Sequence, residues 1–240
     1  MTVSQTRTTF PNVTHVLFDM DGTLLDTERL YTVVSERILA AYGKEFTFEM
    51  KAAMMGTNSQ DAATILIAKS GIPITPEEYI ARAAEIQLEL FPSARPLPGV
   101  ERLVKHLLKH KIPMCVATSS NTPNYHLKTS ENRALFDLFG PNVTCGDDPE
   151  VKAGKPAPDM FLVAAKRLGA DLKRPESCLV FEDSYAGVLS GLNAGMQVVW
   201  IPDERLKLDQ EVVKQVSQVM YSMEEFRPEL YGMPPYDNSE

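Results

Sequence analysis

The sequence contains few cysteines and no long apolar run. None of its three cysteines, Cys115, Cys145 and Cys178, has the spacing of a metal or redox motif, and we expect reduced thiols, with Cys115 and Cys178 in the core. No stretch approaches the roughly 18 apolar residues that a membrane-spanning helix needs, and the first residues lack the apolar segment of a signal peptide. These absences predict a cytoplasmic protein without a membrane partner.

An excess of positive charge is also missing. The 240 residues include 24 Lys and Arg against 32 Asp and Glu, which gives a net charge of −8 at pH 7. Proteins that bind nucleic acids or anionic membranes generally present a basic face, so we expect no nucleic-acid partner. A small phosphorylated metabolite remains compatible with this charge, provided that a metal ion supplies positive charge at the binding site.

Short apolar runs of strand character alternate with helical patterns along most of the chain. Strands are expected at residues 14–20, 112–118, 142–146, 178–181, 197–201 and 217–221. Such alternation is typical of a parallel sheet covered on both faces. The segment after the first strand shows helical patterns alone, at 29–43, 59–71 and 75–91. We therefore predict an α/β fold, a doubly wound parallel sheet formed by residues 1–26 and 96–240, with an all-helical cap domain inserted at 27–95.

The segment FDMDGTLLDTE places two aspartates, Asp19 and Asp21, directly after the apolar run 16–18. In extended chain, residues two apart point to the same side, so we expect both carboxylates to face one way. Two carboxylates held close together repel each other unless a cation or a proton is recruited. A turn at Asp21-Gly22 is the alternative interpretation, because Asp-Gly is a common turn dipeptide, but a turn leaves Asp19 unexplained.

Polar residues follow the other predicted strands as well. Because ligands of open α/β sheets bind at the carboxyl ends of the strands, these residues are expected to meet at one edge of the sheet. A cluster of carboxylates needs a hard cation, and oxygen ligands favour Mg²⁺. The residues concerned are Asp19, Asp21, Gly22, Thr118, Ser119, Ser120, Asn121, Lys155, Glu182 and Asp183.

The segments DMDGTLLD, VATSSN, GKPAPD and VFEDSYAG resemble, in this order, the four motifs of the haloacid dehalogenase superfamily. The resemblance is to the phosphatase-like branch with a helical cap after the first motif, and it runs from about residue 13 to the C-terminus. The cap and the segments GDDPEVKAGKPAPD and FRPELYGMPPY look closest to eukaryotic pseudouridine-5′-phosphatases and the related plant-type glycerol-3-phosphate phosphatases.

The resemblance implies a phosphoric monoester hydrolase that works through an aspartyl-phosphate intermediate. Asp19 would be the nucleophile, ionised at pH 7 because its ordinary pKa is ~3.9. Asp21 would be the general acid for the leaving alkoxide and then the base for the hydrolytic water. Mg²⁺ would be held by Asp19, the backbone carbonyl of Asp21 and Asp183, with Glu182 either as a further ligand or as an acid behind the ligands.

The same resemblance implies a set of residues that hold the phosphate. Thr118, the amide of Ser119 and Lys155 would bind phosphoryl oxygens as charge develops. The remaining members of the expected substrate and phosphate set are Met20, Gly22, Ser120 and Asn121, of which Gly22 would permit the tight turn that brings backbone amides to the phosphate. Asp147 and Asp148 are expected to be loop residues without a direct role. Met50, Met54 and Met55 are expected to belong to a core.

Two other functions stay open. A phosphosugar mutase of the β-phosphoglucomutase type is disfavoured, because those enzymes carry an arginine shortly after the cap glycine and this chain reads Gly56-Thr57-Asn58. A catalytically inactive phosphate-sensing protein is disfavoured by the intact nucleophile, acid and lysine. Among substrates, pseudouridine 5′-phosphate is expected first and glycerol phosphate second, by resemblance alone. We expect a monomer, with a hinge at residues 24–28 where the chain enters the cap.

Overall fold

The structure, a computed structural model, describes residues 9–55 and 59–237. Within these residues, strands that are all parallel form one six-stranded sheet in the order β3-β2-β1-β4-β5-β6. The predicted doubly wound parallel sheet is therefore confirmed, with every strand except β4 shorter than expected. Their bounds are β1 His15–Phe18, β2 Met114–Ala117, β3 Val143–Thr144, β4 Cys178–Glu182, β5 Gln197–Trp200 and β6 Gln218–Val219.

Helices cover both faces of the sheet, as the alternating side chains of β1 require. Val16 and Phe18 belong to the apolar cluster that packs under α5 (Val100–Lys109), whereas Leu17 belongs to the cluster on the opposite face. The opposite cluster contains residues of α8 (Asp159–Leu168) and α9 (Tyr185–Asn193). The side chains of Val16, Leu17 and Phe18 are fully buried. The central strand is therefore held from two sides, and its carboxyl end has a fixed position.

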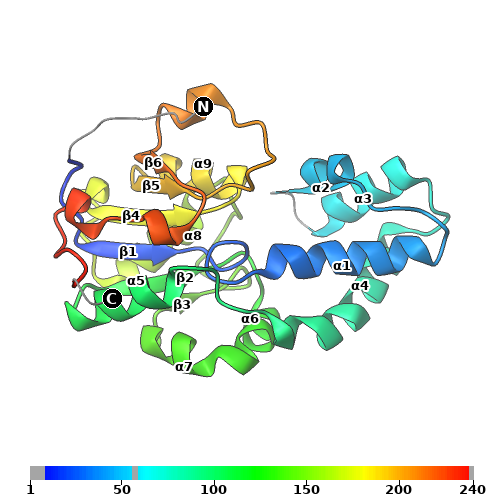
Figure 1. The fold of residues 1–240 in the computed structure, drawn as a ribbon, viewed down its shortest axis with the longest axis horizontal. Helices are drawn as coiled ribbons and strands as arrows, with labels where there is room; N and C mark the ends of the chain where they lie inside the picture. The colour runs from blue at the N-terminus through cyan, green and yellow to red at the C-terminus, as the bar shows by residue number, and fades with distance from the viewer. Residues whose placement is uncertain (1–8, 56–58, 238–240) are drawn as a thin grey trace.

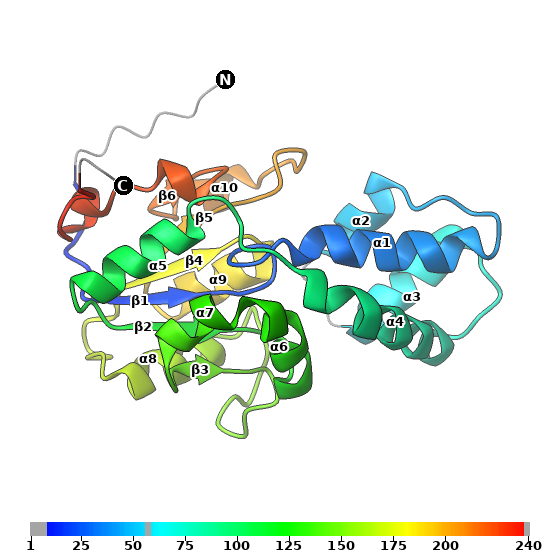
Figure 2. The same cartoon turned by 60° about the horizontal axis from the view of Figure 1, so that its bottom comes forward.

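Among the described residues of the segment 27–90, four helices lie beside the carboxyl end of the sheet, apart from the helices that cover its faces (Figures 1 and 2). We call them the helical unit. They pack around an apolar cluster of their own, which includes Val34, Leu39, Leu66 and Tyr79. The shortest of them, α2, was not predicted. The bounds are α1 Thr27–Ala40, α2 Phe48–Met54, α3 Ser59–Ser70 and α4 Pro76–Leu90.

The start of α4 follows directly from its sequence. The Thr75 hydroxyl accepts a hydrogen bond from the Glu78 amide at 3.2 Å, and the Glu78 carboxylate accepts one from the Thr75 amide at 2.9 Å. Pro76 occupies the first helical position, where its missing N–H costs nothing. Asp26 likewise stands at the N-cap of α1, but its carboxylate pairs with Arg29 at 3.0 Å and does not cap the helix.

Two chain segments connect the helical unit to the sheet, and they lie side by side. The Asp26 amide donates to the Arg95 carbonyl at 2.9 Å, and the Leu97 amide donates to the Leu24 carbonyl at 3.0 Å. Leu25 and Pro96 form an antiparallel bridge between them. The predicted domain division and the hinge at 24–28 fall at this crossing and stay predictions.

The other helices of the sheet region lie on the connections that follow the strands. They are α6 Thr122–Thr129, α7 Arg133–Phe136 and α10 Gln210–Val213. Along the parts of the chain that the structure describes, none of the helices has the length and apolar content to cross a membrane.

Candidate active site

The carboxyl ends of β1 and β4 bring three of the predicted acids together. Because β1 and β4 are neighbours in the sheet, Asp19, which follows β1, lies next to Glu182 and Asp183 at the end of β4. The Asp19 amide donates to the Phe181 carbonyl at 3.0 Å and so extends the ladder by one residue. Carboxylate oxygens of the three acids lie within 4.8 Å of one another, and all three side chains are buried. Oxygen atoms at this spacing could hold a cation.

Lys155 lies between two of these carboxylates. Its ammonium donates to Asp19 at 2.5 Å, to Glu182 at 2.7 Å and to the Ala117 carbonyl at 3.3 Å. Burial alone would lower the pKa of Lys155, but the two carboxylates outweigh burial and raise that pKa above its ordinary value. Lys155 is therefore a permanent cation beside the expected nucleophile.

One lysine does not balance the negative charge of the cluster. Burial raises the pKa of Asp19 to about 8, with the charges of Glu182 and Asp21 adding to the rise and Lys155 opposing it. Burial and the neighbouring charges of Glu182 and Asp19 raise the pKa of Asp183 well above its ordinary value. Among these side chains the pKa of Asp19 lies above its ordinary value, so the expectation that Asp19 is ionised at pH 7 stays a prediction that depends on a cation at the cluster. A bound cation would favour the ionised form of the cluster.

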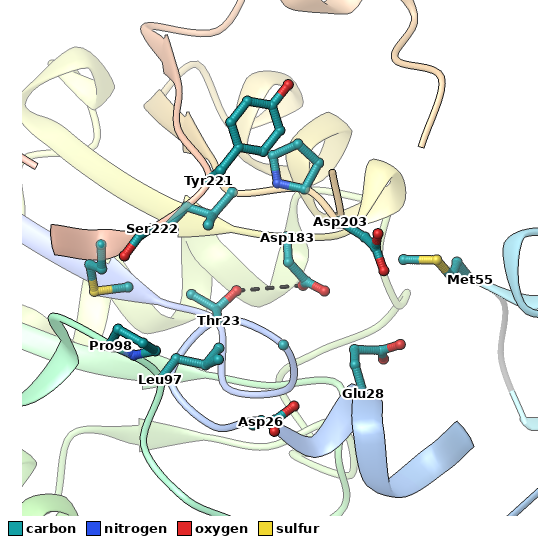
Figure 3. A pocket seen from close by; sticks show the side chains of 14 residues that line it. Thr23, Asp26, Glu28, Met55, Leu97, Pro98, Asp183, Asp203, Tyr221 and Ser222 are labelled. Atoms are coloured by element: carbon teal, nitrogen blue, oxygen red, sulfur yellow. Dashed lines mark hydrogen bonds between the residues drawn. The ribbon is translucent and has the colours of Figure 1, made fainter. Parts of the chain in front are cut away.

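The two acids of β4 have different surroundings. Both oxygens of Glu182 have partners, since Oε1 accepts from Lys155 at 2.7 Å and Oε2 accepts from the amide and hydroxyl of Ser184 at 2.9 and 3.0 Å. Asp183 accepts one long hydrogen bond, of 3.4 Å, from the hydroxyl of Thr23 (Figure 3). The carboxylate of Glu182 is therefore occupied by Lys155 and Ser184, whereas Asp183 keeps lone pairs that could bind a cation.

Asp21 is held apart from this cluster by other partners. Strand β1 ends at Phe18, so both aspartates lie in the loop that follows it. The Asp21 carboxylate accepts hydrogen bonds from the Lys128 ammonium at 2.5 Å and from the Ser120 hydroxyl at 2.8 Å. Burial would raise the pKa of Asp21, but the charge and hydrogen bond of Lys128, together with the Ser120 hydrogen bond, outweigh it and lower that pKa. The two aspartates thus have separate lysines, although they lie close enough for the charge of Asp21 to affect Asp19.

Sequence reasoning missed Lys128. Its side chain on α6 is fully buried, and besides Asp21 its ammonium donates to the hydroxyls of Tyr31 at 2.9 Å and Ser120 at 2.8 Å. A lysine in a polar helix is usually a solvated surface residue, and nothing in the segment TPNYHLKT marks this one as buried. Only the folded structure shows that it faces the site.

The loop after β2 contributes mainly internal contacts. The fully buried Thr118 accepts a hydrogen bond from the Ser120 amide at 3.1 Å, and its hydroxyl lies 3.5 Å from the Asp21 carboxylate. Ser119 is exposed at the tip of this loop. Asn121 caps α6, because its side-chain oxygen accepts from the Asn124 amide at 3.0 Å. Of the expected phosphate-binding residues in this loop, Ser119 and Asn121 are exposed, and the side-chain oxygen of Asn121 is engaged by the helix.

The remaining predicted residues of the first loop act through the backbone. The Met20 side chain is fully buried, and its carbonyl accepts from the amides of Leu24 and Leu25, each at 3.0 Å. Gly22 has φ +80°, and a Cβ there would lie 2.2 Å from Oδ2 of Asp183. Glycine is therefore required both by the left-handed turn and by the close approach of Asp183.

A cavity of about 230 Å³ opens beside Asp183, between the sheet and the helical unit. Figure 3 shows Met55 pointing towards Asp203 from the opposite side, with Glu28 below them. The expectation that Met55 belongs to a core is therefore wrong, since it lines this cavity. Met50 and Met54 pack against the apolar cluster of the helical unit, as expected. Gly56, Thr57 and Asn58, where the mutase arginine is missing, lie outside the described residues.

Two further expectations concern residues outside the site. All three cysteines are buried and free, which confirms the prediction that Cys115 and Cys178 are reduced core residues. Asp147 accepts from the amide and hydroxyl of Thr122, each at 2.9 Å, and Asp148 pairs with Arg167. Both aspartates thus anchor the loop that precedes α8, in agreement with a role in the loop alone.

Comparison with known proteins identifies the family. Residues 13–195 match the model of the haloacid dehalogenase-like hydrolases. The chain belongs to this family. This hydrolase is 46% identical over 230 residues to "(DL)-glycerol-3-phosphatase 2" of Arabidopsis thaliana, with 95% of each chain covered. It is 48% identical over 225 residues to the "Probable pseudouridine-5'-phosphatase" of Drosophila melanogaster, with 93% of this chain and 96% of the relative covered.

A solved structure shares the fold of this hydrolase. The HAD family hydrolase of Deinococcus radiodurans, with bound phosphate and sodium, superimposes with a TM-score of 0.75 at 23% identity, covering 93% of this chain and 98% of the other. The predicted family and the prediction of a phosphoric monoester hydrolase are confirmed by the family match and by the relatives, which are named as phosphatases.

We predict that Gly22→Ala destabilises the hydrolase by more than the cost of a left-handed alanine alone. That cost is about 1–2 kcal/mol, and the new Cβ would also displace Asp183. Gly169→Ala is the matched control, because Gly169 has φ +87° and, among the described residues, a Cβ added there would meet no atom within 4 Å beyond its own helix and chain neighbours. Chemical denaturation should give a larger loss of unfolding free energy for Gly22→Ala. Equal losses would contradict the close approach of Asp183.

Proposed function

We propose that this hydrolase cleaves a small phosphomonoester with Mg²⁺ as cofactor, through an aspartyl-phosphate formed on Asp19. The observation that carries the proposal is the contact of Asp19 with Lys155 at 2.5 Å, in a buried cluster that also contains Asp183. A buried carboxylate with a lysine on one side and cation ligands on the other is suited to attack a phosphate group, because the lysine and a cation held by those ligands would attract the substrate's negative charge.

The donor set of the site fits Mg²⁺. All the available donors are oxygen atoms, which Mg²⁺ prefers. Burial, together with the neighbouring carboxylates, raises the pKa values of Asp19 and Asp183, and a bound cation would offset both effects. Asp19, Asp183 and the backbone carbonyl of Asp21 would hold the ion, with Glu182 behind them on Lys155. When bound, the ion supplies positive charge that screens the carboxylate nucleophile from the phosphate.

The residues of the chain account for both halves of the reaction. An oxygen of Asp19 attacks phosphorus, and the bond from phosphorus to the ester oxygen breaks. Asp21, which must carry a proton at this step although Lys128 favours its ionised form, gives that proton to the departing alkoxide. Asp21 then accepts a proton from water, whose oxygen attacks the aspartyl-phosphate and releases inorganic phosphate and free Asp19. Lys155 and the amide of Ser119 hold the phosphoryl oxygens during both transfers.

We further propose that the helical unit acts as the cap that selects the leaving group. It reaches the sheet region at the cavity, where Met55 lies, and through Phe48, whose ring lies 4.5 Å from the Arg205 guanidinium. Pseudouridine 5′-phosphate is the first proposed substrate and glycerol phosphate the second, and the names of the two relatives support both. A monomer and a cytoplasmic location remain part of the proposal, as does the lack of a nucleic-acid partner.

Replacing the nucleophile tests the proposed chemistry. We expect Asp19→Asn to lower phosphate release from p-nitrophenyl phosphate by at least about 10³-fold, since an amide cannot form the acyl phosphate. Asp171→Asn, an exposed loop substitution, should leave the rate unchanged. Full activity of Asp19→Asn would disprove the mechanism.

Removal of the metal ligands tests the cation site. Mg²⁺ at ~100 times its Kd should add about 2.7 kcal/mol to the unfolding free energy of the wild type. We expect Asp183→Asn to abolish most of this gain and Glu182→Gln to keep the larger part, because both Glu182 oxygens already have protein partners. Thermal unfolding with and without chelator measures the effect. Equal losses would make Glu182 a direct ligand, and no effect on the wild type would rule out the site.

A substrate panel tests specificity. We expect kcat/KM with Mg²⁺ to be highest for pseudouridine 5′-phosphate and next for glycerol 3-phosphate among nucleoside, sugar and polyol monophosphates, because the leaving group is selected by the cap. β-Glucose 1-phosphate with a bisphosphate activator serves as the control for mutase activity. A flat profile would contradict both substrate assignments.

A further inference from the structure

Lys128 is a buried lysine that the proposed mechanism does not use. Its side chain has no exposed surface, and its ammonium has hydrogen-bond partners at 2.5 Å (Asp21), 2.8 Å (Ser120) and 2.9 Å (Tyr31). A lysine side chain loses its hydration and its conformational freedom when it is buried in this way. In return, such a buried ammonium holds its hydrogen-bond partners in a fixed geometry.

The contacts of Lys128 join the sheet region to the helical unit. Asp21 follows β1 and Ser120 follows β2, whereas Tyr31 lies on α1. The ammonium also lies 5.0 Å from the ring centroid of Tyr31 and 4.8 Å from that of Phe91. Phe91 directly follows α4, so the two aromatic rings lie on the segments by which the chain enters and leaves the helical unit.

We propose that Lys128 is a positioning residue, which fixes the carboxyl group of Asp21 for proton transfer to the leaving oxygen and couples that position to the helical unit through Tyr31 and Phe91. This inference rests on the proposed function, in which Asp21 protonates the leaving group. Lys128 forms a buried ion pair with Asp21, as Lys155 does with Asp19, but Lys128 also contacts the proposed cap.

The hydrogen bonds of Asp21 show what removal of the ammonium would change. Oδ1 of Asp21 accepts from Lys128, and Oδ2 accepts from the hydroxyls of Ser120 and Thr118, at 2.8 and 3.5 Å. Without Lys128, Oδ1 loses this charged partner, while Oδ2 keeps the hydroxyls of Ser120 and Thr118. Small displacements of a catalytic group lower the rate strongly, so the proton transfer should suffer while binding of the phosphate by Lys155 persists.

Two esters with different leaving groups separate this role from a merely structural one. The quantity kcat/KM covers the steps through phosphoryl transfer to Asp19. That transfer needs a proton from Asp21 when an alkoxide leaves glycerol 3-phosphate, but not when the stable p-nitrophenolate anion leaves p-nitrophenyl phosphate. For Lys128→Met we expect a loss of about 10²-fold with glycerol 3-phosphate and of less than about fivefold with p-nitrophenyl phosphate.

A milder variant keeps the test valid if Lys128→Met does not fold. Tyr31→Phe removes the hydroxyl that accepts from Lys128 and keeps the ring, so we expect about a tenfold loss with glycerol 3-phosphate and an unchanged kcat/KM with p-nitrophenyl phosphate. Lys105→Met is the matched control. Lys105 is an exposed residue on α5 that pairs with Glu101, and its replacement should change neither reaction.

Several outcomes would overturn the inference. Equal losses with both esters would reduce Lys128 to a structural residue, and so would an unchanged kcat/KM with both. A gain with glycerol 3-phosphate would show that Lys128 restrains Asp21 as an acid, contrary to the proposal. Failure of the proposed function looks different, because then the wild type would hydrolyse neither ester with Mg²⁺, or Asp19→Asn would stay active.

Discussion

The ion pairs of Lys155 place one ammonium between the buried carboxylates of Asp19 and Glu182, at 2.5 and 2.7 Å. Removing one partner of such a buried pair costs about 3–5 kcal/mol, because the remaining charge is left without compensation. Asp183 adds a third carboxylate to the same cluster. Burial and the neighbouring carboxylates raise the pKa values of Asp19 and Asp183, and a cation bound by the cluster would counter both effects.

The fold supplies the rigidity that this crowding of charge requires. The central position of β1, between β2 and β4, lets the loops that follow three neighbouring strands converge on one point, and apolar packing on both faces keeps the strand ends in place. A second ion pair, between Lys128 and Asp21, extends the charged region to the helical unit through Tyr31. The site and the helical unit are therefore parts of one connected set of contacts.

Sequence reasoning succeeded where a residue's position follows from the topology. Asp19, Lys155 and Asp183 were predicted as partners because loops after parallel strands meet at one edge of the sheet. It failed where the outcome depends on packing. Met55 lies at the end of a short helix that was not predicted and lines the cavity, and Lys128 faces inward from a helix whose polar sequence suggests a solvated surface. Side-chain competition also escaped prediction, since the capping of α6 engages Asn121.

The sequence by itself determined the alternation of strands and helices, the family and the chemical types of the reacting groups, because hydrophobic periodicity and short motifs are local properties of the chain. The tertiary structure decided how the charges are shared. It assigned Lys155 to Asp19 and Lys128 to Asp21, turned both Glu182 oxygens towards protein donors, and left Asp183 open to a cation. These assignments depend on distances between residues far apart in the chain and on their burial, which set the pKa values and are defined only after folding.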